Sequence, residues 1–208
     1  MKTKFYVFFI VWMIVGIGGV HAQDLCNNIY VGFSPLGSSR VSFGESDKDT
    51  NLRFDYKSCW NVNLSKEGMM KGFGYLTELT YGMGKFDKIK IEDNYSNDLA
   101  AMASQADDIW TVSGAIYGGQ VFNQGKRVQF PLYAGVGVDY INGGIIHNIM
   151  PFVGVKLRIK VYFTNSIGMW VGGNYNIDFV GAKSFNDNNY SMKASRPFLD
   201  AGVVFSIN

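Results

Sequence analysis

The sequence predicts an all-β protein in which eight antiparallel strands close into an up-and-down transmembrane β-barrel after a cleaved signal peptide. Three observations predict this fold. An export signal precedes the rest of the chain, apolar and polar residues alternate through most of it, and the connections between the alternating segments are short and long in turn. A tilted barrel strand crosses a membrane with about 9–11 residues, and a period of two gives each strand one apolar face.

The composition excludes several other classes of protein. Charged residues make up 17% of the 208 residues and aromatic residues 15%, whereas a typical soluble domain is about 25% charged. Disordered chains lack aromatic residues. Two cysteines and two histidines do not provide a zinc-finger or disulfide scaffold. The net charge of +2 is far from the basic surplus of a nucleic-acid binder, so we expect no nucleic-acid partner.

Residues 1–22 have the three-part layout of a secretory signal peptide. Two lysines precede an uninterrupted apolar run over residues 5–20, and Ala22 ends a small-residue cleavage site. A retained membrane anchor is the alternative, because the apolar run approaches the length of a membrane span, but the cleavage site favours removal. We therefore expect one mature domain, residues 23–208, in which 17 basic residues balance 17 acidic ones.

Alternation predicts five well-defined strands and three weaker ones. The well-defined strands cover residues 52–64, 73–83, 128–140, 153–163 and 167–179, and the weaker ones cover residues 28–35, 110–122 and 198–207. Between Leu52 and Leu64, apolar or small residues occupy every second position and polar residues or Cys59 lie between them. This pattern indicates a single apolar face along the whole segment.

The connections between these strands alternate in length. Short turns are expected at residues 65–71, 123–126 and 164–166, and longer loops at residues 36–51, 85–108, 141–150 and 181–196. This is the layout of outer-membrane barrels, and it predicts that both termini lie at the short-turn end, in the periplasm. Within the second long loop, residues 99–104 could form one or two helical turns capped by Ser96 or Asn97.

Two hairpin registers follow from the positions of the turns. A turn centred on Gly125 places Trp110 beside Tyr140, and the turn at residues 164–166 places Lys160 beside Trp170. Lys160 is then expected to make an ion–ring contact with Trp170.

Alternation alone does not separate a membrane barrel from a soluble lipocalin-like barrel, whose apolar face points inward. Three features favour the membrane. The polar faces are rich in glycine, which suits a narrow interior. Aromatic residues recur at the ends of the apolar faces, as in interface girdles; Trp60 is assigned to the girdle near the short turns and Trp110 to the other. Ten charges on the polar faces also cancel, as charges in a closed lumen must. They are Arg53, Asp55, Lys57, Glu78, Asp139, Lys156, Arg158, Lys160, Asp178 and Asp200.

Cys26 and Cys59 are the only two cysteines of the chain. Export takes the chain through an oxidising compartment, so we expect one disulfide between them, on the lumen side near the periplasmic mouth. That pairing places Tyr30 opposite Asp55 and brings the cysteines to neighbouring positions of two strands. Two free thiols are the alternative.

The last strand carries the most specific motif. Asp200, Gly202, Phe205 and Ile207 have a polar-x-Gly-x-x-aromatic-x-hydrophobic spacing that ends one residue before the C-terminus. This spacing resembles the C-terminal assembly signal of bacterial outer-membrane proteins, and with the export signal and eight strands the mature chain resembles small barrels of the OmpA/OmpX type. The resemblance implies insertion by the barrel-assembly machinery, contact with membrane lipids and lipopolysaccharide, and a monomeric barrel.

Candidate chemistry is sparse. Some barrels of this size are lipid A deacylases or palmitoyltransferases, which need a histidine and a serine nucleophile near the outer rim. His147 has no serine beside it in sequence, although Ser184 or Ser191 could approach it in space. Residues 186–189 are rich in oxygen ligands, but such runs are usually turns. We therefore predict no catalytic residue, no metal and no cofactor.

Two functions remain, and they differ in the use of the lumen. A narrow channel for small solutes, or an OmpW-like route for apolar molecules, requires open or apolar space inside the barrel, whereas an eight-stranded barrel has room for little more than side chains. No apolar lumen stretch is expected. Binding or adhesion through the long loops, to an unknown extracellular ligand, is therefore the leading hypothesis, because loop variation on a rigid barrel commonly carries function.

Overall fold

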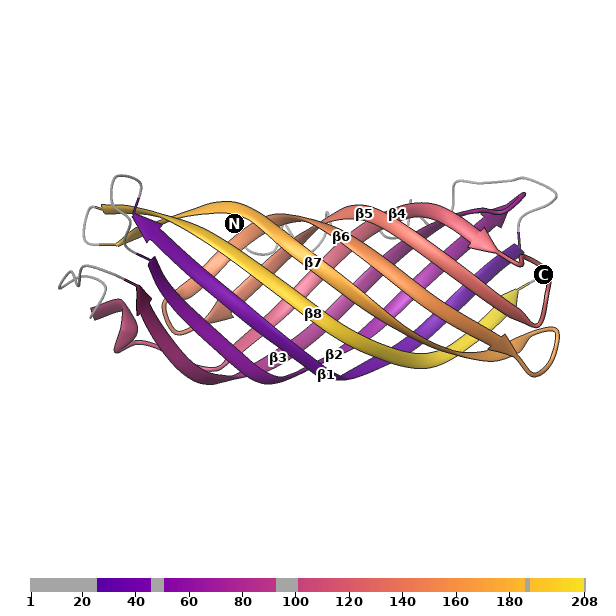
Figure 1. Cartoon of the computed structure of the whole chain (residues 1–208), viewed down its shortest axis with the longest axis horizontal. Helices are drawn as coiled ribbons and strands as arrows, with labels where there is room; N and C mark the ends of the chain where they lie inside the picture. The colour runs from indigo at the N-terminus through magenta and orange to yellow at the C-terminus, as the bar shows by residue number, and fades with distance from the viewer. Residues whose placement is uncertain (1–25, 46–50, 93–100, 186–187, 208) are drawn as a thin grey trace, which may run out of the picture.

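The computed structural model describes residues 26–45, 51–92, 101–185 and 188–207. The predicted signal peptide and the proposed caps Ser96 and Asn97 lie outside these ranges. Within them the chain forms a closed barrel of eight antiparallel strands in sequence order, and β8 pairs with β1 (Figure 1). The strands are β1 Cys26–Glu45, β2 Asn51–Met70, β3 Phe73–Glu92, β4 Ile109–Phe122, β5 Val128–Gly143, β6 Ile146–Tyr162, β7 Ile167–Phe185 and β8 Asn188–Ile207. The predicted fold class is confirmed.

Most strands are longer than alternation predicted. Much of what was expected to be long loop is strand. We call the end of the barrel where β1 begins and β8 ends the turn end, and the opposite end the loop end. Two of the connections are tight turns. The β5–β6 connection is only a turn after Gly143, and in the β2–β3 connection Lys71 and Gly72 have φ values of 49° and 84°. Two consecutive left-handed residues make the tight hairpin turn that suits the strand twist. Residues 101–103 form a single helical turn.

A bulge in β2 reverses the face of the strand. Leu52, Phe54 and Tyr56 are buried inside the barrel, whereas Val62 and Leu64 are exposed on the outside. The change occurs at Ser58, whose φ is 49°, within a break of the β2–β3 register. One extra residue in a strand shifts all later side chains to the other face. The single apolar face predicted for residues 52–64 is therefore wrong, because it is two faces.

Neighbouring strands have breaks at a similar height. The β1 register shifts between Ser34 and Ser39, and the β2–β3 register shifts opposite Asp55 and Tyr56. Between the breaks and the turn end the outward residues are apolar, and between the breaks and the loop end they are largely polar or charged. We conclude that the apolar faces of these strands turn inward where the strands leave the lipid.

The observed registers correct three predictions and confirm one. Tyr30 lies opposite Ser65 and not Asp55, and Trp110 lies opposite Asn142 and not Tyr140. Trp60 pairs with Met83, which places it in the loop-end girdle and not near the short turns. Lys160 lies opposite Trp170, as predicted.

The observed register of β1 with β2 also contradicts the predicted disulfide. Cys26 pairs with Met69, whereas Cys59 lies beside Gly37, further along the barrel. Cys59 is a buried free thiol. The prediction assumed that the β1–β2 hairpin turns earlier than it does, and that β2 has no bulge.

The outside of the barrel carries an apolar belt between two aromatic rims. Val136, Val155, Leu157 and Val171 are about half exposed at its centre. Such a belt is costly in water and is what a barrel presents to lipid. No helix in the described part of the chain is long and apolar enough to cross a membrane.

Candidate functional site

The lumen holds layers of buried charge, and the layer nearest the turn end is built on Glu67. Its carboxylate accepts hydrogen bonds from the amide of Asn28 and the hydroxyl of Tyr30, both at 2.5 Å, and from the hydroxyl of Tyr133. Lys160 Nζ lies 2.8 Å away and completes the ion pair. All these side chains are buried, and a buried charge is tolerated only with such a set of partners.

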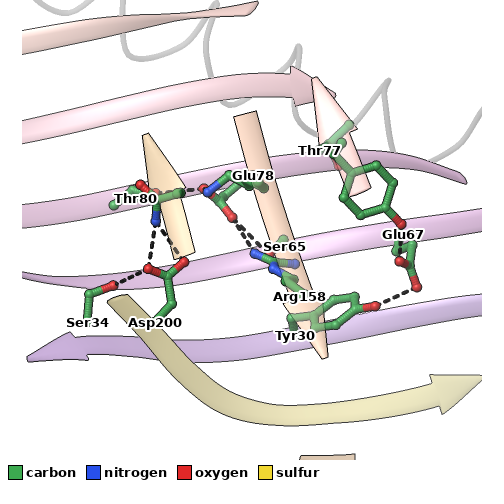
Figure 2. A network of polar contacts seen from close by, with 12 residues as sticks. Tyr30, Ser34, Ser65, Glu67, Thr77, Glu78, Thr80, Arg158 and Asp200 are labelled. Atoms are coloured by element: carbon green, nitrogen blue, oxygen red, sulfur yellow. Dashed lines mark hydrogen bonds and ion pairs between the residues drawn. The ribbon is translucent and has the colours of Figure 1, made fainter. Parts of the chain in front are cut away.

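The next layer is centred on Glu78 of β3. Lys156 Nζ lies 2.7 Å from one carboxylate oxygen and Arg158 Nη2 lies 2.8 Å from the other. Ser65 and Thr80 donate further hydrogen bonds to this carboxylate, at 3.4 and 3.3 Å. Figure 2 shows Ser65, Glu78 and Arg158 pointing toward one another from three different strands. The layer therefore ties together β2, β3 and β6.

Arg158 also makes the principal ring contacts of the lumen. Its guanidinium carbon lies 4.2 Å from the centroid of the Trp170 ring and 4.8 Å from that of Tyr30. Lys160, which was predicted to make the contact with Trp170, has its Nζ 5.7 Å from the Tyr30 centroid. Arginine stacks on aromatic faces more readily than lysine does.

Three buried aspartates lie closer to the loop end, in two clusters. Asp200 is held by neutral donors, because the Asn174 amide donates at 2.6 and 2.8 Å and Ser34 donates at 3.0 Å (Figure 2). Arg196 bridges Asp139 and Asp178, and its Nη2 lies 2.9 Å from the latter. Asp200 thus joins β8 to its neighbours β1 and β7, and Arg196 joins β8 to β7 and, across the lumen, to β5.

Seven of the ten predicted lumen charges lie in the lumen, and three do not. Arg53, Asp55 and Lys57 point outward beyond the bulge of β2. Glu67 and Arg196 replace them inside, and both were missed because they fell in an expected turn and an expected loop. The signal was present, since Asn61, Asn63, Ser65 and Glu67 form a polar series with a period of two.

Little free space remains between the charged layers. A cavity of about 20 Å³ is lined by Glu78, Tyr117, Asn176 and Arg196, among others, which is room for about one water molecule. A wider cavity of about 280 Å³ opens at the turn end, between Met69, Lys126 and Tyr162. In the described part of the lumen, buried side chains therefore occupy the height of each charged layer.

The loop end of the lumen is filled by an apolar plug, which the sequence analysis did not expect. Met102, in the helical turn, packs against inward residues of the strands and is fully buried. The plug consists of Val41, Phe43, Leu52, Phe54, Tyr56, Cys59, Met102, Ile109, Ile141, Ile145, Ile146, Met150, Tyr190, Met192 and Ala194. On β1 and β2 the bulges bring the plug residues inward, whereas β5 and β6 supply theirs without a register shift.

The remaining candidates are placed as follows. His147 lies on the outer surface at the loop end, where Nδ1 is 2.8 Å from Asn142 Oδ1 and 3.1 Å from the Tyr140 hydroxyl. The Ser191 hydroxyl donates to the Gly44 carbonyl oxygen at 3.2 Å, while the Ser184 side chain and residues 186–187 lie outside the described part. No group of residues suited to a metal is found among the described residues.

The C-terminal motif combines outward and inward positions. Phe205 and Ile207 are about half exposed in the apolar belt. Gly202 faces inward, where a Cβ atom would collide with the backbone oxygen of Val31 and lie 2.9 Å from Trp170 Nε1. Gly202 is therefore required by packing as well as by any recognition of the motif.

Comparison with known proteins gives a fold. No protein-family model matches the sequence, and no curated protein is similar to it. Among solved structures, the outer membrane protein OprG from Pseudomonas aeruginosa is 10% identical with a TM-score of 0.55, over 91% of this chain and 98% of OprG. The chain has the fold of a small outer-membrane β-barrel. This barrel also matches Neisserial surface protein A, with 14% identity and a TM-score of 0.46 over 85% of this chain and 96% of that one.

Proposed function

We propose that this barrel is a surface-binding protein of the outer membrane, with its termini in the periplasm and its loop end outside the cell, and that it does not conduct solutes. The closed lumen carries the proposal. Between the turn end and the apolar plug, buried ion pairs on Glu67, Glu78 and Arg196 occupy successive heights, and the cavity among them has about 20 Å³.

The shape of the loop end supports binding there. β1, β2, β3 and β8 have 20 residues each, about twice the length needed to cross a membrane. β4, in contrast, has 14 residues. At the loop end these long strands run past the apolar belt (Figure 1). The lumen below is a rigid, filled support for this projecting rim.

Conductance in planar bilayers tests the proposal. The purified barrel should give no steady single-channel current. A triple variant, Glu78→Ala with Lys156→Ala and Arg158→Ala, removes all three charges of this layer so that none is left without its partner, and it should conduct if the layer is what closes the lumen. A steady ohmic current through the unmodified barrel would contradict the proposal.

Surface labelling tests the orientation. In a background in which Cys26 is changed to Ser and Cys59 to Ala, His147→Cys should react with an impermeant maleimide in intact cells. Lys126→Cys, at an exposed position of the turn end, should react only after the outer membrane is opened. The reverse pattern would overturn the proposed orientation.

A second candidate is the binding or passage of small apolar molecules, and the apolar plug is the observation that favours it. The β6–β7 ladder ends at Phe152 and Asp178, next to Pro151, which has no N–H to donate. Labelled methionine methyl groups would test this candidate during a titration with toluene. Chemical shifts of Met102, Met150 and Met192 should then move, whereas equal movement of the lipid-facing Met169 would indicate unspecific partition.

A further inference from the structure

The outer wall of the loop end carries a strong excess of positive charge on one side. The outward positions of β8, β1, β2 and β3 beyond the bulges hold seven cations and two acids among the described side chains. The cations are Arg40, Arg53, Lys57, Lys85, Lys88, Lys90 and Lys193, and the acids are Asp55 and Asp87. We call this surface the basic wall.

The two acids are already engaged within the basic wall. Asp55 accepts from Arg53 Nε at 2.8 Å and from Arg40 Nε at 3.3 Å, and Asp87 Oδ1 lies 2.5 Å from Lys57 Nζ. Three exposed lysines, Lys85, Lys88 and Lys90, make no ion pair with another described residue. Within the part of the chain that the structure describes, the basic wall therefore carries more positive charge than its own acids neutralise.

The basic wall begins where the aromatic rim ends. Trp60 and Tyr81 form an edge contact with their centroids 6.1 Å apart, and Met83 beside Trp60 is 41% exposed. Lys85 follows Met83 by two residues on the same strand, a rise of about 7 Å. This height is that of lipid headgroups next to an apolar belt.

The opposite side of the barrel has a different surface at the same end. Residues 101–118 and 138–152, which include the loop-end parts of β4, β5 and β6, contain no lysine or arginine. Their rim is formed by Trp110 and Tyr140, with centroids 5.1 Å apart, and by His147. The positive charge is therefore a local feature, in a chain whose expected mature form is neutral.

We propose that the basic wall binds the phosphate groups of a phosphorylated glycolipid in the outer leaflet, with the acyl chains of that lipid on the apolar belt below. Arginine and lysine are the side chains that bind phosphate, and clustered cations beside a membrane span recognise anionic headgroups. The side chains project sideways from the wall, which favours a lipid neighbour over a ligand held at the tips of the connections. The inference rests on the proposed orientation, with the loop end outside.

Native mass spectrometry of the refolded barrel, released from detergent micelles, tests the inference with lipid A as the probe. The barrel should retain lipid A that carries both phosphates at least tenfold better than the same lipid after removal of its phosphates. Raising the ionic strength should weaken only the first interaction, because exposed charges are screened by salt. Equal retention of the two lipids would overturn the inference without the need for a variant.

Matched variants locate the site. The triple change Lys85→Gln, Lys88→Gln and Lys90→Gln should lower retention at least tenfold, and the corresponding change of all three to Arg should preserve it. The control is Lys71→Gln, Lys126→Gln and Arg127→Gln, which removes the same charge at the turn end and should leave retention within twofold. Equal losses in both triple variants would contradict the assignment.

These measurements separate the inference from the proposed function. Retention of lipid A by the basic wall in micelles does not depend on which end faces the cell exterior, whereas labelling of His147→Cys does. Reversed labelling with intact retention would overturn the orientation and, with it, an outer-leaflet source for the ligand. Correct labelling without phosphate-dependent retention would overturn the lipid site alone.

Discussion

At the scale of single residues, the side chains that matter most are long cations held in a space with no room for hydration. Arg158 is 1% exposed, yet it satisfies Glu78 and lies against Tyr30 and Trp170. Such a residue contributes through several contacts at once, and its loss leaves the buried Glu78 carboxylate with Lys156 alone of its two ion-pair partners. A lysine of the basic wall makes few contacts, and water takes its place when the side chain is removed.

Reversal of the charge of Arg158 should be costly. Arg158→Glu places a second carboxylate beside Glu78, and we expect a loss of about 3–5 kcal/mol in the free energy of unfolding, as when a buried pair is broken. Urea unfolding in lipid vesicles measures it. The matched control is Lys57→Glu, whose native side chain is 65% exposed and which should change stability by less than about 1 kcal/mol. Similar losses in the two variants would show that the assignment of inside and outside is wrong.

Asp55 should titrate below its ordinary range. The hydrogen bond from Arg53 lowers the pKa of its carboxyl from 3.8, and Arg40 adds to this effect. Because the folded value is depressed, any stabilisation by Asp55 is present above the unfolded pKa and is lost as the pH falls through the folded pKa. Carbon NMR of the labelled carboxyl should give a midpoint below 3.8, and Arg53→Gln should raise it. An unchanged midpoint in that variant would refute the pairing.

At the scale of elements, the bulge in β2 explains what the sequence could and could not predict. The period of two in residues 52–64 is real, and so are the strands and the β6–β7 register. A bulge at Ser58 and Cys59, however, leaves the alternation of apolar and polar residues in the sequence nearly unbroken. The same break misled the assignment of Arg53, Asp55 and Lys57 to the lumen. Glu67 and Arg196 were lost for a simpler reason, since strands that continue beyond the membrane become polar on the outside and read as loops.

Two changes at Ser58 should have opposite effects. Ser58→Gly relieves a left-handed conformation that costs a non-glycine residue about 1 kcal/mol, so stability should stay equal or rise slightly. Deletion of Ser58 should be strongly destabilising, because Leu52, Phe54 and Tyr56 would then turn out of the plug. Unfolding midpoints of the two variants provide the comparison. A tolerated deletion would argue that this bulge does not set the faces of β2.

Two glycines on neighbouring strands give a contrast in packing. Gly202→Ala in β8 introduces a Cβ atom 2.7 Å from the Gly32 Cα, and we expect destabilisation of about 1–3 kcal/mol from overpacking. Gly173→Ala in β7 meets nothing closer than 3.7 Å and should be neutral. Refolding yield and the urea midpoint in detergent report both. If Gly202→Ala refolds with an unchanged midpoint but fails to insert in cells, the residue serves assembly alone.

At the scale of the whole molecule, the barrel is divided into three zones along its axis. Charged layers fill the lumen within the apolar belt, and an apolar plug fills it beyond the bulges. On β8, β1, β2 and β3 the outer surface changes from apolar to basic at the same height. On the strands that carry bulges, the changes inside and outside the barrel have the same cause, because a bulge exchanges the inward and outward faces of a strand. We therefore infer that the membrane ends at the bulges.

Spin labels placed one at a time at residues 52–64, in the cysteine-free background, locate the membrane boundary along β2. The collision rate with oxygen reports lipid, and the rate with a soluble nickel complex reports water. Oxygen accessibility should peak at positions 60, 62 and 64, while nickel accessibility should peak at 53, 55 and 57. Positions 52, 54 and 56 should be shielded from both reagents. Oxygen maxima at every even position from 52 to 64 would contradict the account, because β2 would then present one unbroken face to lipid.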